Sequence, residues 1–284
     1  MSEQAMHRQE SSNDHSGHSQ TSLPRSLWRA WLTAIGFLTR LPVGRAAHSP
    51  TSADLNRAPV FFPLVGGAIG AFVASLSFAG CQIWSPSIAV IVALTAELLL
   101  TGAFHEDALA DFCDAFGGGS SREDVLRILK DSRIGAFGAV SLFVGILIRF
   151  ACLCSLLSST ETNATALFFA STIASAAIGR WTILLTMSFV APAPGREGLA
   201  SRMFSGPSLN NLVLSSVIVL LACSAWGWLA PVNFAAAVLA LLLVVPGFIF
   251  YVRARIGGMT GDCLGCQCYL AQMVVLLAAA AHAP

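Results

Sequence analysis

Long runs of apolar residues alternate with short polar segments along most of the chain. The hydrocarbon core of a bilayer is about 30 Å thick, so roughly 20 consecutive apolar residues in a helix can cross it. Runs of this kind predict about seven transmembrane helices, at 59–80, 88–104, 136–157, 164–190, 209–229, 232–252 and 267–281. We therefore predict an all-α fold, a polytopic integral membrane helical bundle.

The segments before the first span differ in character. Residues 1–24 are polar, rich in Ser and His, and lack an apolar core of the signal-peptide kind, which predicts a disordered tail before a single membrane-embedded catalytic domain at 25–284. The histidines of this tail could bind a metal, but we favour a tail that is simply solvated. Segment 27–41 predicts an interfacial helix or a short membrane hairpin, because Trp and Arg gather at membrane surfaces; these residues are Arg25, Trp28, Arg29, Trp31 and Arg40.

Composition supports the membrane class. Of 284 residues, 55% are hydrophobic and 11% are charged, and the mean hydropathy of +0.71 is typical of a protein whose partner is the lipid bilayer. A net charge of +1 gives no reason to expect nucleic-acid binding.

The basic residues predict an orientation. Lys and Arg are retained on the cytoplasmic side, and here they occur in every second connection. We therefore expect the N-terminus, the acidic segment at 105–133, the loop after residue 190 and segment 253–266 in the cytoplasm, with the C-terminus outside. The residues concerned are Arg45, Arg57, Arg122, Arg127, Lys130, Arg133, Arg196, Arg202, Arg253 and Arg255.

The strongest chemical signal is HEDALADFCDAFGGG at 105–119. In a helix, Asp107, Asp111 and Asp114 would fall within an arc of about 60° on one face. Carboxylates this close repel one another unless a cation lies between them, which indicates a site for Mg²⁺. The alternative is a solvated acidic face, which the apolar surroundings make less attractive.

A basic segment follows the acidic one. The glycines at 117–119 end the first helix, and Ser120 or Ser121 can cap a second helix. A segment of acidic residues followed by one of basic residues suits a phosphate-bearing substrate, because the basic side chains neutralise the phosphate oxygens that a metal does not reach. The triple glycine also fits a flexible linker. The candidate substrate residues here are Gly118, Arg122, Lys130, Asp131 and Arg133.

A second polar island reads IGGMTGDCLG at 256–265. Thr260 and Asp262 supply oxygen atoms for a metal or a hydroxyl group, and the glycines permit close backbone approach. A glycine-rich turn before a membrane helix is an equally good interpretation. We expect this island on the same side of the membrane as the acidic segment.

Charged residues also fall within the predicted spans, where burial is costly. Arg180 is the candidate for an anionic substrate or a carboxylate partner, whereas Glu97 and Arg149 are interpreted as structural, paired with each other or with backbone groups. Cys263, Cys266 and Cys268 lack a fourth ligand for zinc, so we favour a structural role for them.

The chain resembles the adenosylcobinamide-GDP ribazoletransferase (cobalamin synthase) family. The resemblance covers nearly the whole chain after the tail. Two positions differ, since the family usually has Gly where this chain has Ala108 and Ala115. The motifs, in the family's order, are GFLTRLPV at 36–43, FFPLVGGAIG at 61–70, HEDALADFCDAFGGG at 105–119, the run from Arg122 through LRILKDSRIGAFGA at 122–139, Arg180 with Trp181, and GGMTGDCLG at 257–265.

The resemblance implies an activity: Mg²⁺-dependent transfer of phosphocobinamide from adenosylcobinamide-GDP to α-ribazole or its 5′-phosphate, with release of GMP, at the bacterial inner membrane. Under it, the metal would lie on Asp107, Asp111 and Asp114, with Asp114 or Asp111 accepting the acceptor's proton. Lys130, Arg133, Arg122 and Arg180 would hold phosphate oxygens, and Gly118, Asp131, Thr260 and Asp262 would complete the site. A homo-oligomer, or association with other cobalamin-pathway enzymes, is compatible with the sequence.

Two alternatives remain open. A CDP-alcohol phosphatidyltransferase uses similar membrane-embedded Asp residues, although its longer signature is not matched here. An ion-coupled transporter would carry carboxylates within its spans, but here the acids cluster in one segment beside basic residues.

Overall fold

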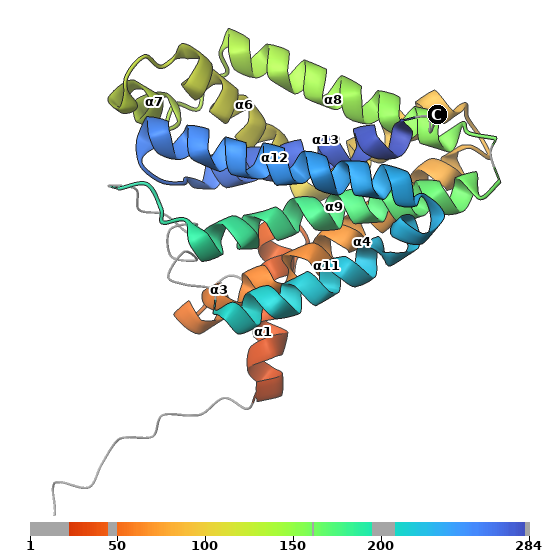
Figure 1. Cartoon of the computed structure of the whole chain (residues 1–284), viewed down its shortest axis with the longest axis horizontal. Helices are drawn as coiled ribbons and strands as arrows, with labels where there is room; N and C mark the ends of the chain where they lie inside the picture. The colour runs from red at the N-terminus through yellow and green to blue at the C-terminus, as the bar shows by residue number, and fades with distance from the viewer. Residues whose placement is uncertain (1–22, 45–49, 161, 195–207, 282–284) are drawn as a thin grey trace, which may run out of the picture.

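The computed structural model describes residues 23–44, 50–160, 162–194 and 208–281, which are helical apart from short connections (Figure 1). The predicted tail lies outside these residues except for Leu23 and Pro24, which begin the first helix. Arg45, Arg196 and Arg202 also lie outside them.

The helices account for the predicted spans. The N-terminal half contains α1 (Leu23–Leu38), α3 (Ser52–Arg57), the 3-10 helix η1 (Ala58–Phe61), α4 (Phe62–Gly80), α5 (Pro86–Thr101), α6 (Phe104–Gly118) and α7 (Arg122–Ile128). The C-terminal half contains α8 (Ala136–Leu157), α9 (Ala164–Phe189), α11 (Leu209–Leu229), α12 (Pro231–Ile256) and α13 (Gly261–Ala280). In the described residues, 6 helices are long and apolar enough to cross a membrane, or 7 if α5 and α6 form one broken span. The polytopic all-α prediction is confirmed.

The second predicted span, 88–104, differs from the structure. Helix α5 ends at Thr101, and the chain turns by 85° into α6. Gly102 (φ 70°) and Ala103 (φ 57°) both adopt the left-handed conformation at this bend. The apolar run continues through Phe104, so hydropathy alone could not reveal where the helix breaks.

Two other boundaries also differ. Helix α13 begins at Gly261 rather than at residue 267, because Thr260 caps it and the glycine-rich island forms its first turn. Segment 27–41 is one helix, α1, up to Leu38, not a hairpin, and it packs against α3 and η1.

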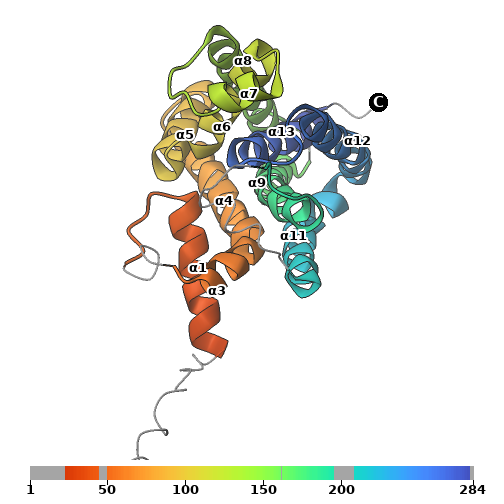
Figure 2. The same ribbon diagram turned by 90° about the vertical axis from the view of Figure 1, so that its left-hand side faces the viewer.

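Helix α9 is the centre of the bundle, and α4, α11 and α13 pack around it (Figure 2). Its buried positions are mostly Ala, Ser, Thr and Gly, which let neighbouring backbones approach closely, as is typical of membrane helices. A Cβ atom built on Gly70 of α4 would lie 2.7 Å from the carbonyl oxygen of Thr172. Glycine therefore sets the α4–α9 distance.

The acidic and glycine-rich segments lie at one end of the bundle, away from the C-terminus (Figure 1). Two hydrogen bonds tie them together. Arg255 Nη2 donates to the carbonyl oxygen of Gly119 at 2.6 Å, and Arg122 Nε donates to that of Ile256 at 3.2 Å. The connection after α6 is thus fixed to the C-terminal end of α12.

Candidate active site

Residues 104–118 form the predicted acidic helix. Its apolar face, with Leu109, Phe112 and Phe116, is buried in the core. Asp107 is exposed, whereas Asp111 and Asp114 are partly buried. The helical prediction is confirmed, and the amphipathic pattern directs the aspartate side chains away from the core, whereas Glu106 is buried.

A cavity of about 330 Å³ joins the two polar segments. Asp107 on α6 and Asp262 on α13 both line it, although 155 residues separate them in sequence. Helices α1, α4 and α9 supply the rest of the wall. The other lining residues are Phe37, Phe62, Phe104, Ala108, Ile183, Met187, Gly261, Leu264 and Gly265.

Three aromatic rings in this wall were absent from our site prediction. Phe37 stacks on Phe62 with ring centroids 5.5 Å apart and meets Phe104 edge-on at 5.3 Å. Phe37 and Phe62 belong to two of the motifs that carry the family resemblance, which was the only signal available in the sequence. The cavity therefore combines an apolar aromatic wall with an acidic rim.

The two departures from the family pattern are accommodated. A Cβ atom on Gly265 would lie 2.5 Å from the Cβ of Ala108, so the extra methyl group of Ala108 faces a glycine on α13. Ala115 is fully buried in the core. Both alanines fit without opening the helix packing.

The carboxylates form one electrostatic group, because Asp111 feels the negative charges of Asp107, Asp262 and Asp114. Hard oxygen donors of this kind suit Mg²⁺. Among the described residues, however, no three His, Cys, Asp or Glu side chains are arranged to hold one ion. The donor chemistry fits a magnesium ion, but binding requires the side chains to move from these positions.

Asp114 already has partners. Its carboxylate accepts hydrogen bonds from the backbone N–H of Gly135 at 2.6 Å and of Gly138 at 2.8 Å. These groups lie at the N-terminus of α8, so Asp114 caps that helix and joins α6 to α8. The carboxylate that our sequence analysis assigned to the metal or the proton therefore also holds the junction between the two helices.

The basic segment forms the predicted second helix, α7, and Ser121 caps it by accepting a hydrogen bond from Asp124 N–H. Asp131 pairs with Arg133 at 2.6 Å, and the hydrogen bonds from Arg133 lower the pKa of Asp131 to about 2. Lys130 and Gly118 are exposed. Within the described residues, no hydrogen bond or ion pair joins Lys130 or Arg133 to the cavity carboxylates.

Arg180 lies deeper in the bundle than the other candidates. Its exposed fraction is 1%, and its Nη1 donates a long bond of 3.4 Å to the carbonyl oxygen of Ala176. Ile183, which lines the cavity, lies one helical turn further along α9. The guanidinium group is buried and is not part of the cavity lining, so direct contact with a substrate there would require rearrangement.

The other buried candidates pair with, or pack against, groups of the protein itself. Arg149 pairs with Glu97, which confirms the predicted pair. Cys263, Cys266 and Cys268 are buried in the same core cluster. Thr260 accepts a hydrogen bond from Cys263 N–H and caps α13.

Replacing Thr260 with valine is expected to lower the free energy of unfolding by about 1 kcal/mol, because the cap of α13 is lost. Unfolding in mixed micelles measures this change. Thr260→Ser, which keeps the hydroxyl group, serves as the control. Unchanged stability in Thr260→Val would contradict the capping role.

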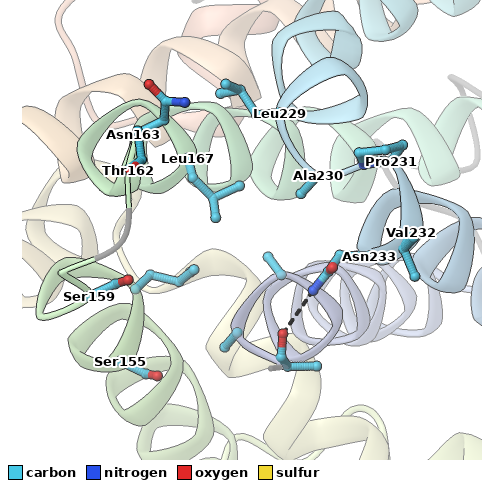
Figure 3. Close-up of a pocket in the computed structure, with 14 residues that line it drawn as sticks. Ser155, Ser159, Thr162, Asn163, Leu167, Leu229, Ala230, Pro231, Val232 and Asn233 are labelled. Carbon is cyan, nitrogen blue, oxygen red and sulfur yellow. Dashed lines mark hydrogen bonds between the residues drawn. The ribbon is translucent and has the colours of Figure 1, made fainter. Parts of the chain in front are cut away.

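A second cavity of about 330 Å³ lies at the end of the bundle that holds the C-terminus (Figure 1), and Figure 3 shows its lining in close-up. It is bounded by the ends of α8, α9 and α13 and by the α11–α12 connection. The dashed line marks the bond from Asn233 to the carbonyl oxygen of Ala281, 2.9 Å. The described residues that line it include no charged side chain, so it is not a candidate for phosphoryl chemistry.

The chain matches the family model for cobalamin-5-phosphate synthase over residues 30–280. A protein of Ralstonia pickettii named adenosylcobinamide-GDP ribazoletransferase is 38% identical over 255 residues, covering 89% of this chain and 95% of its own. Proteins with the same name from Ralstonia nicotianae and a Shewanella species are 38% and 36% identical, over 89% and 86% of this chain and 93% and 94% of their own. No solved structure matches the chain. The acidic cavity, the helical membrane fold and these similarities agree, and the chain belongs to the cobalamin-5-phosphate synthase family.

Proposed function

We propose that this protein transfers the phosphocobinamide group of adenosylcobinamide-GDP to α-ribazole or its 5′-phosphate, giving adenosylcobalamin or its 5′-phosphate and GMP. Family membership and the named relatives support the reaction. The observation that carries the proposal is the cavity where Asp107 and Asp262 meet. Nothing in the geometry favours the phosphatidyltransferase or transporter alternatives.

In this reaction the acceptor hydroxyl attacks the phosphorus atom that carries cobinamide. A new P–O bond forms, the bond to the oxygen of GMP breaks, and the hydroxyl proton must be accepted by a base. We assign the proton to Asp111, because its carboxylate has no hydrogen bond within the described residues. Asp114 instead holds the junction between α6 and α8.

Asp107, Asp111 and Asp262 would hold Mg²⁺, with Asp114 beside them. When bound, the ion supplies charge neutralisation at phosphate oxygens. Lys130, Arg133 and Arg122 lie on the segment that follows and would attract the remaining phosphate charge. Gly118, Asp131 and Thr260 would border the substrate, while Arg180 would act through its charge from its buried position on α9.

The aromatic wall suits an apolar part of a substrate. Phe37, Phe62 and Phe104 offer ring faces and edges against which the planar base of α-ribazole could pack. We assign the cavity to the cytoplasmic side of the bacterial inner membrane, because Lys and Arg are concentrated in the connections at that end.

The test is GMP release from adenosylcobinamide-GDP by the purified protein in lipid nanodiscs, with and without Mg²⁺ and each form of the acceptor. Release that needs both metal and acceptor, with a cobalamin product, is the expected result. Absence of turnover by protein that unfolds cooperatively would contradict the proposal.

A further inference from the structure

A buried ionic network lies beside the acidic helix. Arg149 of α8 donates from Nη2 to Glu97 of α5 at 2.6 Å and from Nη1 to Glu106 of α6 at 3.0 Å. The exposed fractions of these three side chains are 8%, 4% and 6%. Our sequence analysis predicted the pair with Glu97 and missed Glu106.

The network spans the sharp bend between α5 and α6. Glu97 precedes the turn of 85° and Glu106 follows it, so one guanidinium group connects both arms. Ala103 sits at the bend with φ 57°, a conformation that is strained for a residue with a side chain. Gly102 adopts its left-handed conformation without strain, but Ala103 does not, so contacts from other helices must help to maintain the bend.

The same arginine also reaches α13, the helix that carries Asp262. Its guanidinium carbon lies 5.4 Å from the centre of the Tyr269 ring on α13. Tyr269 follows Asp262 by seven residues, which places both on the same face of α13. Arg149 thus contacts both helices that carry the carboxylates of the cavity.

Glu106 directly precedes Asp107 in α6. Successive helical residues point about 100° apart, so holding Glu106 inward fixes the direction in which Asp107 and Asp111 point. Misplacement of reacting groups by about 1 Å can cost roughly 100-fold in rate. Small rotations of α6 would therefore matter for catalysis.

A contribution to the stability of the fold does not by itself explain why these three residues are charged. A buried ion pair must overcome a large desolvation cost, and apolar replacements of similar volume are often as stable. The guanidinium group of Arg149 instead provides directional hydrogen bonds, because its N–H groups have a fixed geometry.

We propose that Arg149, Glu97 and Glu106 are positioning residues that hold the bend between α5 and α6 and thereby aim Asp107 into the cavity and set the direction of Asp111, one helical turn further along α6. The catalytic consequence of this positioning rests on the proposed function. The geometry of the bend can be tested without it.

The first test is Arg149→Lys, which keeps the charge but cannot donate in two fixed directions. We expect kcat to fall by about 10- to 100-fold, with the KM of both substrates within about threefold of the unmodified protein. A kcat equal to that of the unmodified protein would overturn the proposal.

The second test separates positioning from stability. The double variant Glu97→Gln/Arg149→Met removes one negative and one positive charge, leaving Glu106 with the nearby charge of Arg180. We expect Arg149→Met alone to lower the unfolding temperature more than the double variant does. The kcat of the double variant should nevertheless stay low. Recovery of kcat together with stability would show a merely structural role.

Ser216→Ala is the matched control. It removes the interhelical bond that Trp181 donates to Ser216, 3.1 Å, between α9 and α11, away from the bend. Its kcat should be unchanged.

Hydrogen exchange at amides of 104–118 provides a readout independent of activity. Faster exchange is expected in Arg149→Lys and in the double variant, and unchanged exchange would contradict the positioning role. If the unmodified protein shows no turnover, the proposed function fails, while the exchange data still decide whether Arg149 holds the bend.

Discussion

Replacing Asp111 with asparagine is expected to lower kcat for GMP release by about 100- to 1,000-fold, the largest effect of any substitution considered. Asparagine has nearly the same shape but carries no charge and cannot accept the hydroxyl proton. The carboxylate of Asp111 has no hydrogen bond within the described residues, so its loss breaks no such contact. The measurement is steady-state GMP release alongside thermal unfolding.

Thermal stability should therefore stay the same or rise slightly, since one of four repelling carboxylates becomes neutral. Glu123→Gln is the matched control, because Glu123 is an exposed acidic residue on α7 outside the lining of the cavity. Its kcat should remain unchanged. Substantial activity in Asp111→Asn would remove Asp111 from the proposed machinery.

Replacing Asp114 with alanine is expected to have the second largest effect, and of a different kind. Two backbone N–H groups at the start of α8 lose their acceptor, and that of Gly138 is buried. Hydrogen bonds to a charged group contribute about 1.5–3 kcal/mol each. We expect the free energy of unfolding to fall by about 2–3 kcal/mol, together with kcat.

Asp114→Asn distinguishes the roles of this residue. Its amide oxygen can still accept one N–H, so we expect about half the loss of stability seen with alanine. Unfolding in mixed micelles and GMP release should be measured on both variants. Full stability of Asp114→Ala with no turnover would instead support the assignment of Asp114 to the metal or the proton.

The hydrophobic pattern predicted the helices well because apolar length in a bilayer is a local property. Segments such as 136–157 and 209–229 coincide with α8 and α11. The bend at Gly102 and Ala103 was missed, since a left-handed residue within an apolar run leaves hydropathy unchanged. The start of α13 was missed because its first turn is polar and rich in glycine.

Features of the site could be predicted where the residues concerned are close together in the sequence. The acidic helix and a serine cap at Ser120 or Ser121 could be derived from spacing and capping preferences alone, and the structure chose Ser121. The partners of Asp114 could not, because they depend on the position of α8. The aromatic wall of the cavity likewise requires α1, α4 and α6 to meet.

The sequence by itself determined the helical membrane class, the acidic face of 104–118 and the family resemblance. These depend on periodicity, apolar length and motif order, which are properties of neighbouring residues. Only the tertiary structure decided that Asp262 joins Asp107 in one cavity, that Arg180 is buried outside its lining, and that Arg149 bridges Glu97 and Glu106. Such contacts join residues far apart in the chain, and their partners are chosen by how the helices pack rather than by local propensity.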